Sequence, residues 1–463
     1  MSLAGRIRHA VNKVPRSGPD SRESWLMAAL CGMLLLLCFS TVGVSGVFFY
    51  GILETFGSTR EEAAWPVTLN GALLLLGGPI MGFLSERYSC RKVLLGCSII
   101  SGLAVSLCFF ARTLACVTLL FGIVHGTTLS GLYVNANVLV AQHFERRRVT
   151  ATSLAYTTGG FYAVAFSSLA ELLRSTYGTR GAFLLYGAIL MNAVPLSIML
   201  RSPPAKLVPS CQRKTSKDFA RSGKDEAESL DVESDDVACG TRLSVVVVEA
   251  RPLNDKVARV SEEVKCAVRP FLTYAFTVNT LSFSVISGAV FLFVMLSTDL
   301  STDRGASTVD ATRLLQVFCV TDITVRPLTG LAIDSKFISL ESVMTLGFLL
   351  QGAAFELLAW CGSFRVMLLA SALMGLTCGS RIPLHAPSLA RDFGVENLPL
   401  LMGGSSLCMG VVSLLRPPFV GRAADAPWPH FRTPMIVFET LNNASVGTEG
   451  MLMQPCRSGK SSG

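Results

Sequence analysis

Gly82-Phe-Leu-Ser-Glu86-Arg87-Tyr88 and Gly330-Leu-Ala-Ile-Asp334-Ser-Lys336 repeat one pattern in two distant parts of the chain. In each stretch a glycine stands four residues before an acid, and a base follows closely. Both stretches close an apolar run long enough for a membrane helix. The glycine permits close helix packing, and the acid suits a helix amino terminus or a base across an interface. The repeat predicts a helical membrane protein of two similar halves, with Gly82, Glu86, Arg87, Gly330 and Asp334 as packing and conformational residues.

The composition of the 463-residue chain supports the membrane interpretation. Hydrophobic residues make up 51% of it and charged residues 16%, whereas ordinary soluble domains carry about 25% charged residues. The net charge of +8 comes from short basic clusters between apolar runs, which is typical of membrane topology signals. The charge therefore orients the chain in the membrane and says little about partners; the apolar runs predict contact with the lipid bilayer, and we predict no nucleic-acid partner.

The chain carries no signature of an enzyme or a metalloprotein. The repeated glycines fall within apolar runs, and no phosphate-binding loop of the Gly-x-x-x-x-Gly-Lys-Ser/Thr type is present. Most of the 14 cysteines lie in apolar runs and none forms a CxxC pair, so we interpret them as small buried helix residues. We predict no catalytic residues, no metal site and no cofactor.

Eleven apolar runs approach the roughly 20 residues that a membrane helix needs. They are Trp25–Tyr50, Ala63–Leu84, Val93–Phe110, Leu114–Val140, Val149–Leu172, Gly181–Leu200, Ala267–Leu296, Leu314–Ile333, Ile338–Trp360, Val366–Leu389 and Leu400–Val420. The runs predict an all-α integral membrane protein with about eleven visible spans.

The runs divide the chain into five segments. We expect an N-terminal segment at 1–24, a six-helix half at 25–200, a second half with five spans at 266–424 and a polar tail at 425–463. Residues 201–265 are rich in charge and serine without a sustained apolar period, which predicts a disordered linker. Basic clusters at the N-terminus and in alternate loops predict that the N-terminus and the linker are cytosolic.

No twelfth apolar run follows Asp425, although two equal halves would have six spans each. An eleven-span chain would place its tail outside the cell. The sequon Asn443-Ala444-Ser445 would then be open to glycosylation. A truncated isoform that does not transport is therefore one interpretation of the sequence.

Asp322 and Arg326 are opposite charges within one expected span. They lie four residues apart and so share one face of a helix. Each charge at bilayer depth costs roughly 2.5–3.5 kcal/mol on insertion scales, and an apolar pair would cost less. We hypothesise that a protonated Asp322 releases Arg326, which then holds a carboxylate with two hydrogen bonds. The alternative is a static tether between helices.

The parallel repeat is typical of major facilitator transporters, and several stretches resemble the monocarboxylate transporter family of that superfamily. They are residues 143–160, which begin His-Phe-Glu-Arg-Arg-Arg-Val-Thr-Ala, then Trp65, Gly77-Gly78-Pro79, residues 320–327 with the sequence Val-Thr-Asp-Ile-Thr-Val-Arg-Pro, and Arg416-Pro417-Pro418 with Gly421-Arg422. This resemblance implies a major facilitator fold of two pseudo-symmetric helical halves. It also implies secondary transport of small organic monocarboxylates across the plasma membrane by alternating access.

The same resemblance implies roles for individual residues and a partner. Asp322 and Arg326 occupy the positions that serve proton coupling and carboxylate binding in the family, and an accessory single-span glycoprotein is implied as a partner. Proton-coupled lactate carriers have a lysine in the first helix where this chain has Gly43. Two interpretations therefore stay open: a proton symporter of monocarboxylates, or a proton-independent facilitator of neutral or zwitterionic solutes.

Four further polar residues within the runs are candidates for lining a solute cavity: His125, Asn135, Asn137 and Arg381. For the histidine and the two amides, the alternative is hydrogen bonding between helices. Arg381 either attracts an anionic solute or extends to the membrane interface. His385 lies four residues further along the same run.

Overall fold

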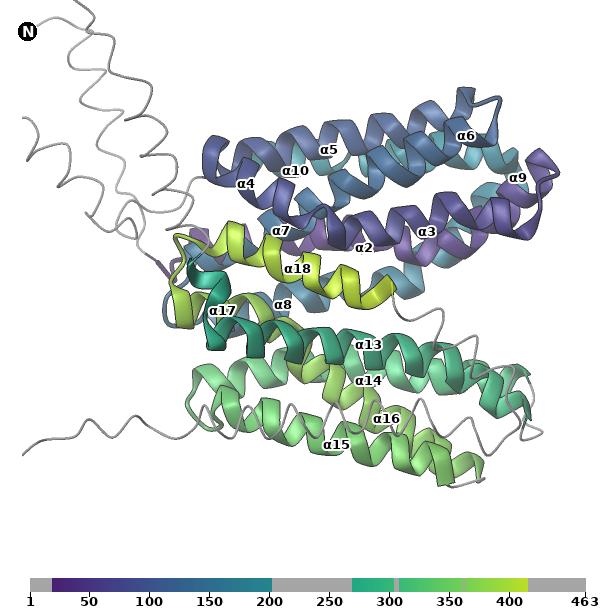
Figure 1. The fold of residues 1–463 in the computed structure, drawn as a ribbon. Coiled ribbons are helices and arrows are strands. Elements are labelled where there is room, and N and C mark those ends of the chain that lie inside the picture. Colours follow the sequence, from purple (N-terminus) through teal and green to yellow (C-terminus); the bar gives the residue numbers. More distant parts are fainter. Residues whose placement is uncertain (1–18, 202–268, 304–307, 361–362, 415–463) are drawn as a thin grey trace, which may run out of the picture. The chain divides into compact units, whose positions relative to one another are not determined.

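The computed structural model describes residues 19–201, 269–303, 308–360 and 363–414. Within these ranges every regular element is helical, which confirms the predicted all-α fold. In the described residues each predicted apolar run overlaps one helix or consecutive helices (Figure 1); residues 267–268 and 415–420 of two runs lie outside them. Residues 202–265 of the expected linker, the expected tail, the region of the missing twelfth span, the sequon and the Arg416 motif lie outside the described residues.

The first half consists of nine α-helices in the described residues. They are α2 (Arg22–Phe56), α3 (Arg60–Leu76), α4 (Gly78–Tyr88), α5 (Cys90–Leu107), α6 (Leu114–Val117), α7 (Gly126–His143), α8 (Arg148–Gly160), α9 (Tyr162–Leu190) and α10 (Ala193–Met199). A 3-10 turn, η1 (Cys108–Phe110), continues α5, and a π-helix, η2 (Thr118–His125), joins α6 to α7.

The second half contains the remaining described helices. They are η4 (Arg269–Leu272), α13 (Tyr274–Asp303), α14 (Thr308–Asp334), α15 (Leu340–Trp360), α16 (Phe364–Arg381), η5 (Ile382–Leu384), α17 (His385–Phe393) and α18 (Leu398–Leu414). The short η5 continues α16 into α17, so these three elements together form the predicted tenth span.

Glycines end or bend the helices at two places in the first half. Gly77 separates α3 from α4 with a bend of 48°, and Pro79 in the first turn of α4 has no amide hydrogen to continue the ladder. Gly178 adopts φ 69° inside α9, a conformation that glycine reaches without steric cost. The kink at Gly178 divides α9 where the fifth and sixth apolar runs were predicted to be separate.

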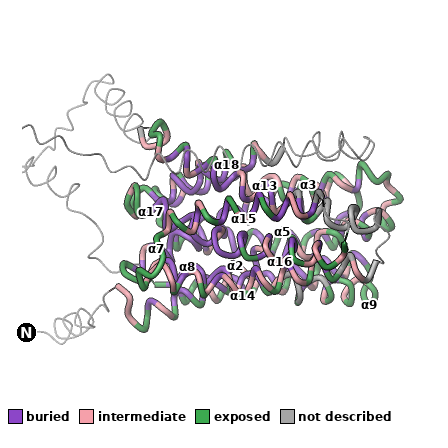
Figure 2. The backbone as a smooth tube through the Cα atoms, turned by 90° about the horizontal axis from the view of Figure 1, so that it is seen from below, coloured by how far each residue is buried: buried purple, intermediate pink, exposed green. Residues whose placement is uncertain are grey.

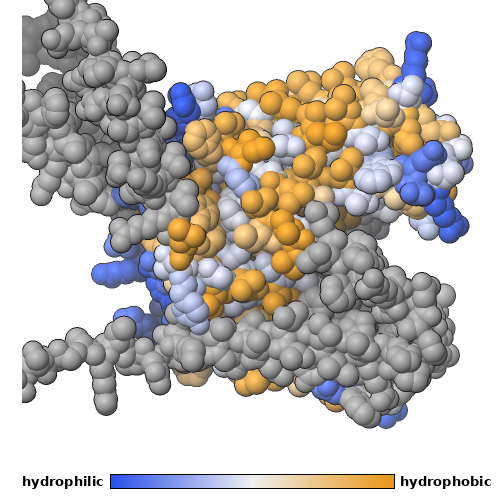
Figure 3. All heavy atoms as spheres, viewed as in Figure 1, coloured by the Kyte–Doolittle hydropathy of each residue, from blue (hydrophilic) through white to orange (hydrophobic). Residues whose placement is uncertain are grey.

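Six helices of the described residues are long and apolar enough to cross a membrane, and the bent pair α3–α4 makes a seventh. Two shorter apolar helices, Tyr274–Val290 and Leu398–Val412, add to these. On α5, Ile99, Ile100 and Leu103 are exposed. Figure 3 shows apolar residues across the visible face, with hydrophilic residues gathered towards its ends. An exposed apolar face of this kind suits a lipid environment.

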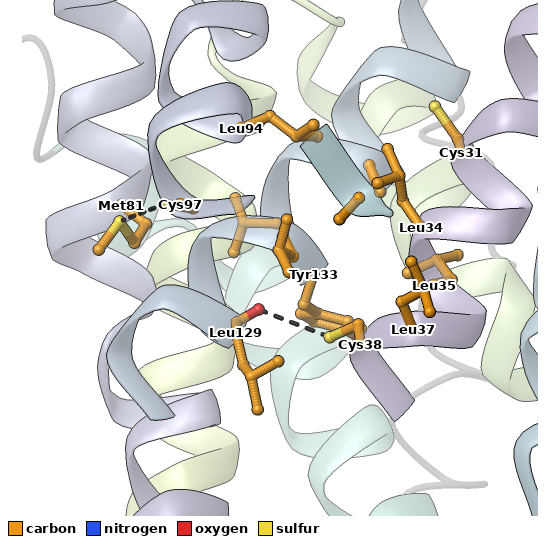
Figure 4. Close-up of a cluster of buried hydrophobic side chains, with 14 of the residues drawn as sticks. Cys31, Leu34, Leu35, Leu37, Cys38, Met81, Leu94, Cys97, Leu129 and Tyr133 are labelled. Carbon is orange, nitrogen blue, oxygen red and sulfur yellow. Dashed lines mark hydrogen bonds between the residues drawn. The ribbon is translucent and has the colours of Figure 1, made fainter. Parts of the chain in front are cut away.

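Helices α2 and α7 form the centre of the first half. The residues of α7 are buried along almost its entire length (Figure 2). Cysteines of α2 and α5 pack among leucines, and the Cys38 thiol donates to the Leu129 carbonyl at 3.6 Å (Figure 4). Cys31, Cys38 and Cys97 are buried free cysteines, as expected for small helix residues.

The most extensive contacts between the halves in the described residues are those of α4 with α18 and of α8 with α14, and α3 also packs against α18. The first two crossings depend on glycine. A Cβ on Gly403 would lie 3.2 Å from the Pro79 Cα, and one on Gly330 would lie 2.8 Å from the Thr150 Cα. Together with the contacts of α17 to α7 and α8, these crossings hold the halves together at the end of the bundle that carries Asp334.

Candidate solute site

Asp322 and Arg326 form a buried ion pair on one face of α14. The Arg326 Nη2 donates to the Asp322 Oδ2 at 2.5 Å, and the two residues are 7% and 8% exposed. The spacing of four residues places both side chains on the same side of the helix. The structure therefore brings together the two charges that the sequence singled out.

Arg326 also contacts the other half of the protein. Its Nη1 donates to the main-chain carbonyl of Tyr156 on α8 at 2.5 Å. Gly160 provides room for this contact, because a Cβ there would lie 3.0 Å from Nη1. The guanidinium thus joins α14 to α8 while it is paired with Asp322.

The ion pair leaves hydrogen-bonding capacity unused. Neither the Asp322 Oδ1 nor the Arg326 Nε has a hydrogen-bond partner in the described part of the chain. Nε and Nη2 share one edge of the planar guanidinium, the edge that binds a carboxylate through two parallel hydrogen bonds. One donor of this edge is unpartnered, and Asp322 occupies the other.

A cavity of about 250 Å³ adjoins the pair. The first half contributes mostly aromatic side chains and the second half the polar ones. The lining comprises Phe39, Leu74, Leu75, Tyr133, Tyr156, Tyr162, Phe283, Ile286, Ser287, Val290, Phe318, Asp322, Arg326, Cys378, Ile382, His385 and Met409. Sites for drug-sized ligands measure roughly 300–1,000 Å³, so this cavity suits a smaller solute.

An aromatic group forms the wall of the cavity in the first half. The Phe39 ring lies 6.0–6.2 Å, centroid to centroid, from the rings of Tyr133, Tyr156 and Tyr162. The Tyr156 hydroxyl donates to the Tyr133 hydroxyl at 3.3 Å. Apolar walls with few polar groups raise the strength of the ionic contacts that a solute makes inside the cavity.

The other four polar candidates are absent from this lining; His125 and Asn135 bond to neighbouring helices, whereas the bond of Asn137 lies within α7. His125 hydrogen-bonds to Thr41 Oγ1 at 3.1 Å and to Ser101 Oγ at 2.9 Å. The Asn135 Oδ1 accepts from Ser85 Oγ at 2.6 Å, and the Asn137 Nδ2 donates to the Tyr133 carbonyl at 2.8 Å.

Arg381 is fully buried, so its side chain does not extend to an interface in this structure. Its Nη2 donates to Gln351 Oε1 at 2.5 Å and its Nε to the Thr377 carbonyl at 2.8 Å. The guanidinium also lies 4.6 Å from the centroid of the Phe348 ring. These contacts join α16 to α15 inside the second half.

The two copies of the glycine–acid pattern differ in their contacts. The Asp334 Oδ2 accepts from the Thr150 amide at 2.7 Å and from the Thr150 hydroxyl at 2.6 Å, at the first turn of α8. Glu86 and Arg87 are exposed at the end of α4. Gly82 packs against α18, where its Cβ would lie 3.1 Å from the Pro399 carbonyl carbon.

Sequence reasoning did not assign the cavity residues His385, Tyr156 and Cys378 a role. A signal was present for two of them, because Cys378, Ile382 and His385 recur at intervals of four and three residues and so share one helix face. The Tyr156 contact uses a main-chain carbonyl, which every residue has, and no sequence pattern marks it.

Two helical halves that enclose a small cavity with a buried ion pair define a membrane carrier. The family model of the Major Facilitator Superfamily matches residues 29–336. The chain belongs to that superfamily. Its named relatives are transporters, and the chain is a transporter rather than an enzyme.

Two named relatives indicate which transporters of the superfamily the chain resembles. The chain is 24% identical to monocarboxylate transporter 3 of Rattus norvegicus over 417 residues, which cover 89% of this chain and 77% of that protein. It is 23% identical to monocarboxylate transporter 2 of Homo sapiens over 415 residues, covering 88% and 80%. The chain is therefore related to monocarboxylate transporters.

A solved structure shares the fold. The proton:xylose symporter XylE, bound to 6-bromo-6-deoxy-D-glucose, superposes with a TM-score of 0.64 at 12% identity. The match covers 92% of this chain and 94% of that one. The predicted major facilitator fold is thereby confirmed.

Proposed function

We propose that the chain is a secondary carrier of small organic monocarboxylates that moves them by alternating access, with a proton. The observation that carries this proposal is the buried guanidinium beside a cavity, with one donor unpartnered and the adjacent donor held by a carboxylate. An anionic solute is the ligand that such an edge recognises best. The size of the cavity favours a solute of few atoms.

In the proposed cycle the solute and Asp322 compete for Arg326. When Asp322 takes up a proton, its attraction for Nη2 falls, and Nε with Nη2 binds the solute carboxylate. The proton stays on Asp322 while the solute neutralises the guanidinium, so the loaded site has no net charge. Release of the solute restores the ion pair, and the proton leaves.

The proposal includes a location and an orientation. The basic residues Arg146, Arg147 and Arg148 support a cytosolic position for their loop, and with it for the N-terminus and the linker. The end that carries Asp334 would then face the cytosol in a plasma-membrane protein. An epitope at the N-terminus should bind antibody only in permeabilised cells. Co-purification of a single-span glycoprotein with this chain would support the proposed accessory partner.

Uptake of labelled propionate and 2-hydroxypropionate at two external pH values tests the ion pair. Arg326→Lys keeps the charge but removes the planar two-donor edge, and loss of one charged hydrogen bond of about 1.5–3 kcal/mol lowers uptake at least tenfold. Asp322→Asn should abolish stimulation by external acid. Arg174→Lys is the matched control, because Arg174 pairs with Glu54 at 3.0 Å on an exposed surface. Undiminished uptake by the Arg326 variant contradicts the proposal.

A second candidate is a proton-independent facilitator of neutral or zwitterionic solutes. Arg326 is the only lysine or arginine among the described residues of the lining, and Asp322 balances its charge. The resemblance implies a lysine at the position of Gly43 in proton-coupled lactate carriers, and Gly43 adds no cation. Uptake of labelled alanine that does not respond to external pH, without uptake of propionate, would favour this candidate.

A further inference from the structure

The guanidinium of Arg326 is anchored at both of its terminal nitrogens, and the two anchors belong to different halves. Nη2 donates to the Asp322 Oδ2 on the same helix, and Nη1 donates to the main-chain carbonyl of Tyr156 on α8, each at 2.5 Å. Two bonds at different corners of a planar group fix its orientation. The third nitrogen, Nε, has no hydrogen-bond partner in the described residues. The direction in which Nε points therefore depends on both halves.

The two anchors respond differently to a proton. In the proposed cycle Asp322 takes up a proton and loosens its bond to Nη2. The carbonyl of Tyr156 does not titrate and stays an acceptor throughout. It also belongs to the last turn of α8, which ends at Gly160, and the carboxyl end of a helix favours a cation. Of the two anchors, the carbonyl is therefore the one that still holds the guanidinium when its solute-binding edge becomes free.

Tyr156 is held firmly inside the first half. The residue is 2% exposed, its hydroxyl donates to the Tyr133 hydroxyl at 3.3 Å, and its ring centroid lies 6.1 Å from that of Phe39. These contacts and the regular backbone of α8 fix the direction of the carbonyl. A group whose own position is locked by packing orients its partner precisely.

Access of the guanidinium to this carbonyl depends on Gly160, one turn further along α8. A Cβ there would lie 3.0 Å from Nη1 of Arg326 and 3.1 Å from the Ile323 Cγ1, so an added methyl group would push Nη1 away from the carbonyl. Gly32 of α2 contacts α8 elsewhere, and a Cβ there would lie 3.1 Å from the Thr158 Cβ. The two glycines leave α8 similar room, but of the two Gly160 adjoins the guanidinium.

We infer that Tyr156 is a positioning residue for solute binding: its main-chain carbonyl holds Nη1 of Arg326 so that Nε and Nη2 face the cavity. Gly160 provides the space in which this bond forms. The inference rests on the proposed function and adds a group of the first half to the recognition of the solute carboxylate. It applies to the conformation in which the halves meet at the Asp334 end, which uptake from the opposite side of the membrane samples.

Gly160→Ala tests the inference by steric displacement of Nη1. The KM for propionate taken up from the side opposite Asp334 should rise about tenfold, the effect of losing a hydrogen bond to a charged group. The maximal rate per carrier at the membrane should stay close to that of the wild type. Gly32→Ala is the matched control, because it crowds α8 without touching Arg326, and its KM should not change. A merely structural role of Gly160 would reduce the amount of carrier and leave the KM unchanged.

A main-chain substitution tests the bond without added volume. Replacing Thr157 by its α-hydroxy analogue turns the amide that follows Tyr156 into an ester, whose carbonyl is a weaker acceptor. The same replacement of Thr158 weakens the carbonyl of Thr157 instead and is the control. Each replacement removes one amide donor from α8, so the difference between the two KM values reports on the Tyr156 carbonyl. The KM should be roughly three- to tenfold higher for the ester at Thr157.

The ester pair decides the outcome if Gly160→Ala fails to reach the membrane. Equal KM values for the two esters overturn the inference and leave the proposed function standing, and so does an unchanged KM in a Gly160→Ala carrier that reaches the membrane. A wild type that takes up neither propionate nor 2-hydroxypropionate overturns the proposed function and this inference together.

Discussion

Asp334 offers a direct test of how the halves are held together at one end of the bundle. Its carboxylate accepts two hydrogen bonds from Thr150, at 2.7 and 2.6 Å, from the opposite half. Asp334→Asn keeps the shape but removes the charge. Charged hydrogen bonds contribute about 1 kcal/mol more than neutral ones, and a charge at a helix amino terminus adds about 0.3–1 kcal/mol.

The conformation in which the halves meet at the Asp334 end should therefore lose about 2–3 kcal/mol of stability relative to the conformation that is open at this end. At 1.4 kcal/mol for each factor of ten, the conformational equilibrium shifts by roughly 30- to 150-fold. Thr150→Val removes only the hydroxyl donor and leaves the amide, so its shift should be smaller than that of Asp334→Asn.

Cys378 is a native reporter of this shift because it lines the cavity. Membrane-impermeant thiol reagent is applied to sealed vesicles from the side of Asp334, and modification of the Cys378 peptide is measured by mass spectrometry. Modification should be faster in Asp334→Asn than in the wild type. Glu86→Gln is the control, because Glu86 holds the equivalent place in the repeat but is exposed. Equal rates in Asp334→Asn and the wild type would refute the reasoning.

Three further substitutions have defined outcomes. Gly379→Val places side-chain atoms against the Asp322 backbone and should lower stability by about 1–3 kcal/mol through overpacking, seen as a lower Tm in detergent together with reduced transport. His125→Leu removes the hydrogen bonds to Thr41 and Ser101; Thr41 keeps its bond to the Tyr186 hydroxyl, so the loss falls mainly on Ser101 and should cost about 1–3 kcal/mol. The KM of the transported solute in the surviving fraction should stay unchanged, and an unchanged Tm contradicts this prediction. Arg381→Met keeps most of the buried volume but loses the bond to Gln351, so Tm should fall and KM should not change, whereas a large rise in KM would show that Arg381 acts on the solute.

The helices and the two halves were predictable because a membrane span needs a long apolar run and little else. The pairing of Asp322 with Arg326 was predictable for a similar local reason, since four residues along a helix bring side chains together. Breaks within a run were harder to foresee. The π-helix at Thr118–His125 interrupts a continuous apolar stretch without a proline.

The sequence indicated that either acid of the repeat could meet a helix amino terminus across an interface, but it could not show which of the two does. Glu86 and Asp334 fill the same place in a repeat, yet only Asp334 reaches the first turn of a helix in the other half. The difference arises from how the helices cross, which depends on residues far apart in the chain. The surroundings of His385 depend on distant residues in the same way, because its ring bonds to Ser405 on the next helix and lines the cavity between the halves.

The glycine crossings between the halves have a consequence for natural variation in this gene product. Gly78 lies so close to α18 that a Cβ there would stand 2.9 Å from the Ser406 Cβ, and the equivalent crossing at Gly330 leaves as little room. Such positions lie outside the solute cavity, so a survey confined to binding residues would classify changes there as harmless. We expect the reverse ranking: replacement of these glycines by larger residues should impair transport more than many conservative replacements within the cavity wall.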